Sequence, residues 1–231
     1  MSEQQRVALI AGATGLVGGY LVRKLLVSPL YSQVISVTRR KINGPNAMIS
    51  SHRKLRQIII PLDDMETCLA DQKIAADDAY CALGTTIKRA GSQNAFRHVD
   101  FDYVVNFARA AKAAGARRFS LVSAVGASAK SSIFYSRVKG ETEDAVSAMG
   151  FDATQIFRPS MLLGERTESR PAETVARVLM PLINPFLMGG ASIYCGIDPE
   201  RVAMAMVAAA SEDVQGRKVY HYNEMMERAQ F

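Results

Sequence analysis

The sequence predicts an α/β protein built on a doubly wound parallel sheet, with a small lobe at its C-terminal end. Two observations support this fold class. Short apolar runs alternate with segments of helical periodicity from Val7 to Pro159, and the first run leads straight into a glycine-rich loop and a helix. Continuous apolar runs are typical of strands buried on both faces of a parallel sheet. Right-handed crossovers between such strands produce the doubly wound arrangement.

Six apolar runs are predicted as strands. In chain order they are RVALIAG (6–12), QVISVTR (33–39), QIIIPLD (57–63), DAYCALGT (78–85), RRFSLVSA (117–124) and DATQIFRP (152–159). Helices are predicted over 16–28, 101–115, 134–150 and 198–211. Gly115 and Gly150 stand where helix C-terminal caps are expected. Asp198 is a good N-cap, and Pro199 follows at the first helical position.

The length of 231 residues fits one large domain. After Pro159 the regular alternation stops, and no linker rich in Gly or Ser and no repeat follows. We therefore expect residues 1–231 to form a single domain, to which residues 160–231 contribute a small substrate lobe.

Composition narrows the class of protein. The N-terminus lacks the basic and apolar regions of a secretory signal, and no apolar segment reaches the ~20 residues of a membrane span. Cys68, Cys81 and Cys195 are odd in number and widely spaced, which indicates reduced thiols and no metal site. We expect a cytoplasmic protein without a metal or a membrane partner. The net charge of +6 suits an anionic ligand or a plain solvated surface.

The glycine-rich loop GATGLVG places Gly12, Gly15 and Gly18 three residues apart, between a strand and a helix. Gly12 allows a sharp turn, Gly15 lets a pyrophosphate approach the backbone, and Gly18 allows close packing of the helix. The helix N-terminus supplies free N–H groups and a partial positive charge. A tight turn without a ligand is the alternative, and the strand–loop–helix context favours nucleotide binding. The residues predicted to hold the pyrophosphate are Gly12, Thr14, Gly15, Leu16, Val17 and Gly18.

The end of the second predicted strand indicates which dinucleotide binds. An NAD site usually has an acidic residue there, but this chain reads VTRRK and has no Asp or Glu from Arg39 to Leu62. The guanidinium groups of Arg39 and Arg40 suit a 2′-phosphate. We therefore predict NADP(H) as the cofactor, with a solvated basic loop as the alternative.

Two Tyr–Lys pairs have the spacing of one helical turn. Tyr20 and Lys24 lie on the helix of the glycine loop, far from the expected nicotinamide, and are predicted to pack on the helix flank. Tyr135 and Lys139 open the helix after the fifth strand, whose C-terminal tip carries Ser123. Ligands bind at this edge of doubly wound sheets. Ser123, Tyr135 and Lys139 are therefore predicted to converge beside the nicotinamide.

This combination resembles the short-chain dehydrogenase/reductase family of Rossmann-fold enzymes. The segments GATGLVG, LVSAVGA, YSRVK and FRPSMLLG carry the resemblance from Val7 to Gly164. ALGTT, VDFDYV and ESRP look like an atypical branch, the Tat-interacting-protein oxidoreductases. In the family the tyrosine is the general acid/base, the lysine lowers the tyrosine pKa and holds the nicotinamide ribose, and the serine bonds the substrate oxygen. The resemblance assigns these roles to Tyr135, Lys139 and Ser123.

Further site residues are predicted at the ends of the later strands: Asp63, Leu83, Gly84, Arg158 and Pro159. Arg158 and Arg170 could equally be structural ion-pair partners. Many relatives have an Asn on the helix before the fifth strand, but this chain has Asp100 there. The resemblance also implies that the helices flanking the sheet could pair in a homodimer.

The sequence therefore predicts an NADP(H)-dependent oxidoreductase acting on a small carbonyl or alcohol. The alternative is an NADP(H)-binding regulatory or redox-sensing protein with little turnover. A nucleic-acid binder using the basic segment from Arg39 to Arg56 is disfavoured, because that segment lacks interleaved aromatic residues. The short tail also disfavours a nucleotide-sugar substrate.

Overall fold

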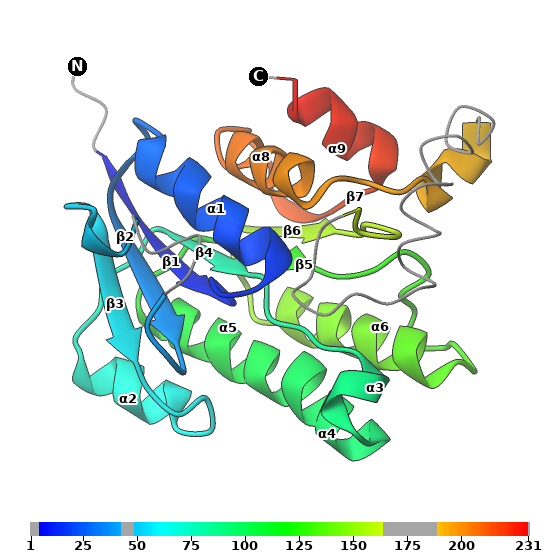
Figure 1. Ribbon diagram of the computed structural model, residues 1–231, viewed down its shortest axis with the longest axis horizontal. Helices are drawn as coiled ribbons and strands as arrows, with labels where there is room; N and C mark the ends of the chain where they lie inside the picture. Colours follow the sequence, from blue (N-terminus) through cyan, green and yellow to red (C-terminus); the bar gives the residue numbers. More distant parts are fainter. Residues whose placement is uncertain (1–4, 43–48, 164–188, 231) are drawn as a thin grey trace.

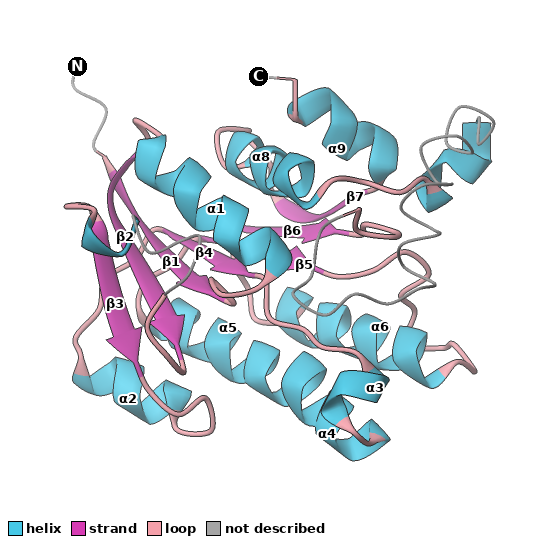
Figure 2. Cartoon of the chain, in the orientation of Figure 1, coloured by secondary structure: helices cyan, strands magenta, loops and turns pink. Residues whose placement is uncertain are grey.

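The computed structural model describes residues 5–42, 49–163 and 189–230. They form a seven-stranded parallel sheet between two layers of helices, as Figures 1 and 2 show. The strand order is β3-β2-β1-β4-β5-β6-β7. The winding direction thus reverses between β1 and β4, which is where sheets of this type form a ligand crevice. The predicted fold class is confirmed.

Each of the six predicted apolar runs contains a strand, and a seventh strand follows near the C-terminus. The strands are β1 (Arg6–Ala11), β2 (Tyr31–Thr38), β3 (Leu55–Ile59), β4 (Asp78–Cys81), β5 (Arg118–Val122), β6 (Ala153–Phe157) and β7 (Gly216–Tyr220). β4 ends four residues before the predicted boundary, because the apolar residues Ala82 and Leu83 already belong to the loop that follows.

The four predicted helices are present as α1, α5, α6 and α8, and shorter helical segments stand between them. The helical segments are α1 (Leu16–Val27), α2 (Met65–Asp71), α3 (Ile87–Ala90), α4 (Gln93–Arg97), the π-helical turn η2 (His98–Asp102), α5 (Tyr103–Ala113), α6 (Phe134–Ser147), the 3₁₀ turn η4 (Gly189–Tyr194), α8 (Pro199–Ala209) and α9 (Tyr222–Arg228). Ser92 caps α4 by accepting the N–H of Ala95 (3.1 Å), and Asp198 caps α8 by accepting the N–H of Glu200 (2.7 Å).

A separate apolar core lies on each face of the sheet. Helices α1, α8 and α9 cover one face, and α2, α5 and α6 cover the other (Figure 1). Burial on both faces explains why the central strands read as unbroken apolar runs. No helix in the described ranges is long and apolar enough to cross a bilayer.

The C-terminal part of the chain differs from the expectation for residues after Pro159. The alternation of strands and helices resumes near the C-terminus, where α8 packs on α1 and β7 pairs in parallel with β6. Val202 and Met206 of α8 are fully buried in the core that α1 also enters. The described residues from Gly189 onward thus include a strand and two helices of the main fold. Residues 164–188 of the predicted lobe lie outside the described residues.

Candidate cofactor and catalytic site

The glycine loop lies against the loop that follows β4, at the point where the winding reverses. Gly12 has a φ of +90°, in the left-handed region that favours glycine. A Cβ atom at this position would overlap the backbone carbonyl of Ala82. Ala82 in turn donates its N–H to the carbonyl of Ala11 at 2.9 Å. The two loops are therefore in direct backbone contact, and the sharp turn predicted for Gly12 is present.

The start of α1 is suited to an anion. Gly15 is exposed and is the N-cap, with no side-chain cap and no acidic residue in the first turn. Its N–H donates to the carbonyl of Gly12 at 2.9 Å, which closes the turn. A Cβ atom at Gly18 would overlap the same carbonyl oxygen, so the helix approaches the loop more closely than any side chain permits. Thr14 is exposed, Leu16 half-buried and Val17 buried. These features fit the pyrophosphate of a dinucleotide.

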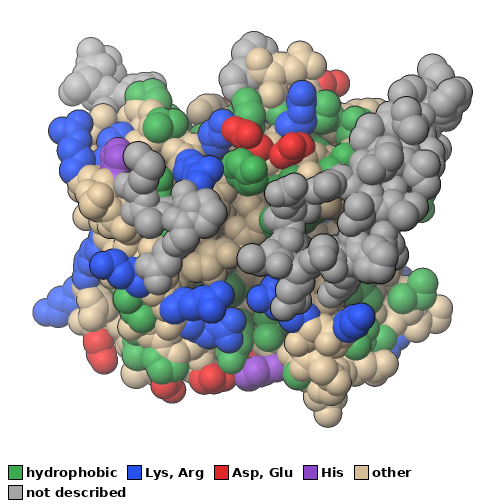
Figure 3. Space-filling model, in the orientation of Figure 1, with side chains coloured by type: hydrophobic (Ala, Val, Ile, Leu, Met, Phe, Trp, Pro, Cys, Tyr) green, Lys and Arg blue, Asp and Glu red, His purple; other side chains and the backbone are tan. Residues whose placement is uncertain are grey.

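The end of β2 is basic and open. Arg39, Arg40 and Lys41 are exposed, and the guanidinium groups of the two arginines form no hydrogen bond or ion pair with the described part of the chain. In Figure 3, Lys and Arg side chains gather on the left of the molecule, where Figure 1 places β2 and β3. Thr38, the last residue of β2, is buried and its hydroxyl has no partner among the described residues. This surface fits the ribose 2′-phosphate predicted from the sequence.

Asp63 follows β3 and takes part in a polar cluster. Its carboxylate accepts hydrogen bonds from His98 (2.8 Å) and from the Tyr103 hydroxyl (3.0 Å). The other ring nitrogen of His98 lies 3.0 Å from Asp102. The bonds to Asp102 and Asp63 raise the pKa of His98, and the bonds from His98 and Tyr103 lower the pKa of Asp63. The predicted cofactor residue Asp63 thus already holds the loop before α2 to the π-helical turn.

Tyr135 and Lys139 lie one turn apart at the start of α6. The Tyr135 ring is half-buried and packs at 5.4 Å from the ring of Phe96, measured between centroids. Lys139 is 7% exposed, and its Nζ lies 2.7 Å from Asp100 Oδ1. Burial acts to lower the pKa of Lys139, but the charge of Asp100 and the nearby Tyr135 outweigh it, so the pKa is raised.

Asp100 belongs to the π-helical turn that precedes α5, and its side chain is fully buried. Its Oδ2 accepts the N–H of Thr85 at 2.8 Å, and its backbone carbonyl accepts the Thr142 hydroxyl at 2.9 Å. Gly84 completes the site: a Cβ atom there would lie 3.3 Å from Asp100 Oδ1 and 3.5 Å from Lys139 Nζ. Sequence reasoning singled out Asp100 but missed its pairing with Lys139, because no spacing rule connects residues so far apart in the chain.

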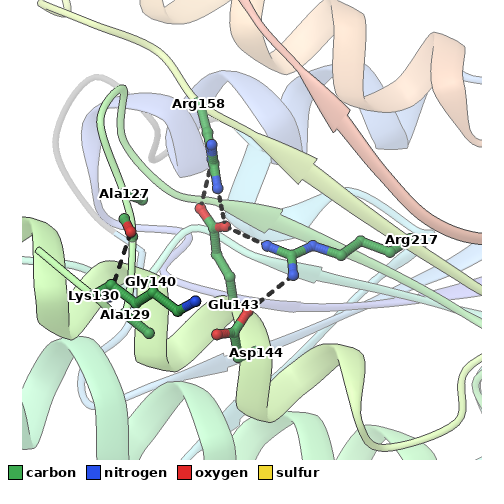
Figure 4. Close-up of a pocket in the computed structure, with 9 residues that line it drawn as sticks. Ala127, Ala129, Lys130, Gly140, Glu143, Asp144, Arg158 and Arg217 are labelled. Atoms are coloured by element: carbon green, nitrogen blue, oxygen red, sulfur yellow. Dashed lines mark hydrogen bonds and ion pairs between the residues drawn. The ribbon is translucent and has the colours of Figure 1, made fainter.

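Ser123 and Arg158 are held by Glu143, a fully buried residue of α6 that sequence reasoning missed. The Ser123 hydroxyl donates to Glu143 at 2.5 Å, and Arg158 donates twice to the same carboxylate, at 2.9 and 2.6 Å. Arg217 of β7 adds a bond of 2.8 Å. Figure 4 shows both guanidinium groups pointing at Glu143.

These contacts bear on two predictions. A hydroxyl has one proton to donate, and in this structure that of Ser123 goes to Glu143. The contact of Ser123 with a substrate oxygen stays a prediction. The Arg158 guanidinium is an ion-pair partner, as the alternative had it, and is not directed at a cofactor. Arg170 lies outside the described residues.

The remaining predicted cofactor residues, Leu83 and Pro159, contact other parts of the fold. Leu83 packs on the core beneath α5, and the carbonyl of Pro159 accepts the N–H of Val125 at 3.0 Å. Of the second Tyr–Lys pair, Tyr20 packs on the core beneath α1, and Lys24 lies 2.6 Å from Glu200 of α8. The flank packing predicted for Tyr20 is what the structure has.

Comparison with known protein families agrees with this geometry. The model of the NAD(P)H-binding family matches residues 12–181, which include the glycine loop and the Tyr135–Lys139 pair. The chain belongs to the NAD(P)H-binding family. An NAD(P)-binding Rossmann domain of the atypical short-chain dehydrogenase/reductase type is therefore confirmed.

Curated relatives in this family are similar over most of their length. Protein HTATIP2 from Rattus norvegicus is 37% identical over 174 residues, which cover 75% of this chain and 70% of that protein. Protein fmp52, mitochondrial, from Aspergillus clavatus is 37% identical over 221 residues, covering 91% of this chain and 88% of that protein. Several fungal relatives are likewise named as mitochondrial proteins, which contradicts the cytoplasmic location expected from the sequence.

Solved structures agree with the family at the level of the fold. A short-chain dehydrogenase from Streptomyces avermitilis superposes with a TM-score of 0.64 at 16% identity, covering 98% of this chain and 92% of that one. At this level of identity the likeness concerns the arrangement of the strands and helices alone.

Proposed function

We propose that this protein is an NADP(H)-dependent oxidoreductase acting on a small carbonyl or alcohol. The observation that carries the proposal is the Tyr135–Lys139 pair, one turn apart on α6, with Lys139 buried beside Gly84. The exposed Arg39 and Arg40 at the end of β2 support NADP(H) over NAD(H). Membership of the NAD(P)H-binding family supports the dinucleotide itself.

In this proposal the backbone N–H groups at the start of α1 bind the pyrophosphate, and Arg39 and Arg40 bind the 2′-phosphate. The bound nicotinamide supplies hydride. Tyr135 donates its hydroxyl proton to the carbonyl oxygen, and the positive charge of Lys139 stabilises the phenolate that is left. A free tyrosine has a pKa of ~10, so acid/base work near neutral pH depends on such a charge.

The test of catalysis is reduction of a panel of small aldehydes, ketones and quinones, followed by NADPH absorbance. Tyr135→Phe removes only a hydroxyl, so turnover should fall by roughly 10²–10⁴-fold, the usual size of general acid/base catalysis. NADPH affinity should be retained. Tyr20→Phe is the matched control and should leave turnover unchanged. Full activity in Tyr135→Phe would overturn the role of the tyrosine.

The test of cofactor choice is calorimetric titration with NADPH and NADH. Replacing Arg39 and Arg40 by Ala should lower the affinity for NADPH by about ten- to a hundredfold per lost contact, since a charge-assisted bond contributes roughly 1.5–3 kcal/mol. NADH binding should stay close to that of the wild type. Arg53→Ala, in the same basic segment, is the control. Equal losses for both cofactors would show that these arginines do not read the 2′-phosphate.

A second candidate function is supported by two contacts in the site. Lys139 already has an ion-pair partner in Asp100, and the Ser123 hydroxyl donates to Glu143. Both side chains are thus engaged within the protein, which suits an NADP(H)-binding regulatory protein with little turnover. Tight NADPH binding without reduction of any carbonyl on the panel would favour this function over the first.

A further inference from the structure

The buried ion pair between Asp100 and Lys139 joins three segments of the chain. Their side chains are 0% and 8% exposed, so both charges are almost out of water. Taking two charges out of water is costly unless further hydrogen bonds satisfy them. Asp100 has such a bond from the N–H of Thr85, in the loop after β4. The pair therefore connects three segments: the loop after β4, the π-helical turn and α6.

The groups around Lys139 show what maintains its charge. Tyr135 acts on it from the same helix, Cys81 from β4 and Asp100 from the π-helical turn. Burial raises the pKa of the Cys81 thiol to about 12, so this thiol is neutral at ordinary pH. Of these groups, Asp100 is the one that brings a full negative charge. Without it, burial alone would drive Lys139 toward its neutral amine.

We propose that Asp100 is a positioning residue that keeps the buried Lys139 charged and holds its Nζ beside Gly84, in place for the cofactor. This inference deepens the proposed function and rests on it for the role of Lys139 toward the cofactor. It predicts that Asp100→Asn converts Lys139 from a permanently charged group into one that titrates within the working pH range.

The first test measures NADPH affinity from about pH 6 to 9 in wild type, Asp100→Asn and Lys139→Met. Wild-type affinity should exceed that of Lys139→Met by a similar factor at every pH. Asp100→Asn should resemble wild type at the acidic end and Lys139→Met at the alkaline end, a change of at least tenfold for one charge-assisted contact. If the NADPH affinity of Asp100→Asn stays a constant fraction of the wild-type affinity at every pH, the proposal is overturned.

Asp102→Asn is the matched control. Asp102 lies in the same π-helical turn and carries the same charge, but its side chain is half-exposed and pairs with His98. This variant should follow the wild-type pH profile. A profile like that of Asp100→Asn would mean that net charge, and not the contact with Lys139, sets the effect.

A second test needs neither cofactor nor substrate. If Lys139 in Asp100→Asn is neutral in the fold, its protonation opposes folding, so stability should rise with pH toward the ordinary lysine pKa of ~10.4. The reference is Asp100→Asn combined with Lys139→Met, which has no ionisable side chain at either position. The difference in unfolding free energy between the two variants, from urea titrations, should change with pH in this direction.

The two tests separate the possible failures. Absence of NADPH binding in the wild type would sink the proposed function, while the urea titrations would still decide the role of Asp100. A pH-independent stability difference between the single and the double variant would overturn the inference about Asp100 even if NADPH binds. If Asp100→Asn fails to fold at neutral pH, recovery of folding at alkaline pH would support the inference. If the double variant Asp100→Asn with Lys139→Met also fails to fold at both pH values, the inference is refuted.

Discussion

Gly15 and Gly18 lie one turn apart but differ in what a side chain would meet. Gly15 has a φ of −85°, which any residue adopts, and a Cβ atom there would lie 3.3 Å from the nearest atom, the Gly12 oxygen. At Gly18 a Cβ atom would overlap that oxygen. The first glycine therefore leaves space at the helix N-terminus, and the second allows the helix to pack.

Gly15→Val should therefore lose NADPH binding without losing the fold. We expect an affinity at least about a hundredfold lower, equivalent to one or two lost charge-assisted contacts. Calorimetry with NADPH and a thermal unfolding curve measure the two effects. Gly18→Ala should show a lower unfolding midpoint, because overpacking costs about 1–3 kcal/mol. Unchanged NADPH affinity in folded Gly15→Val would rule out the loop as the pyrophosphate site.

At the scale of elements, Glu143 connects α6 with three strands. It accepts bonds from Ser123 after β5, from Arg158 after β6 and from Arg217 in β7. Glu143→Gln should destabilise the protein by roughly 1.5–3 kcal/mol, because the half-buried Arg158 loses its charge-assisted bonds to the carboxylate. The free energy of unfolding in urea measures this loss. Asp144→Asn is the control on the next residue: it also pairs with Arg217 but is exposed, so the cost should stay within about 1 kcal/mol.

The cluster of His98, Asp63 and Asp102 should make stability depend on pH. The pKa of His98 is raised, so its stabilising effect is complete below the ordinary value of ~6.5 and is lost as pH rises through the folded-state pKa. The pKa of Asp63 is lowered, so its effect is present above ~3.9 and is lost as pH falls below that value. The stability difference between wild type and His98→Gln should therefore be largest in mildly acid solution and shrink toward alkaline pH. Urea titrations at several pH values check this, and a difference that grows with pH would contradict it.

These elements differ in how far the sequence predicts them. The central strands are predictable because they are buried on both faces and read as apolar runs. β7 was missed because it is an edge strand whose GRKVY carries the exposed Arg217 and only half-buried Lys218. The glycine loop and the Tyr135–Lys139 turn are local patterns and could be predicted. The Asp100 and Glu143 contacts could not, because their partners are distant in sequence and meet only once the sheet has formed.

At the scale of the whole molecule, the C-terminal helices are part of the core. Met206 of α8 is fully buried between α1 and the sheet, whereas Met204 on the same helix is partly exposed. Met206→Ala should lower the free energy of unfolding by about 2–5 kcal/mol, and Met204→Ala by clearly less. Denaturant unfolding measures both. Equal small effects would mean that α8 contributes little to the stability of the core.

The packing of α8 on α1 also bears on how the chain is made. Helix α1 leaves the ribosome well before helix α8, which packs on it. At ~5–20 residues per second, the apolar side of α1 waits roughly 10–40 seconds for its partner. During that interval the nascent chain exposes the part of α1 that α8 later covers, and chaperones that bind apolar surface can reach it. Chaperone demand during synthesis is thus a property of this connectivity, and moving the segment of α8 and β7 ahead of β1 by circular permutation would shorten the wait.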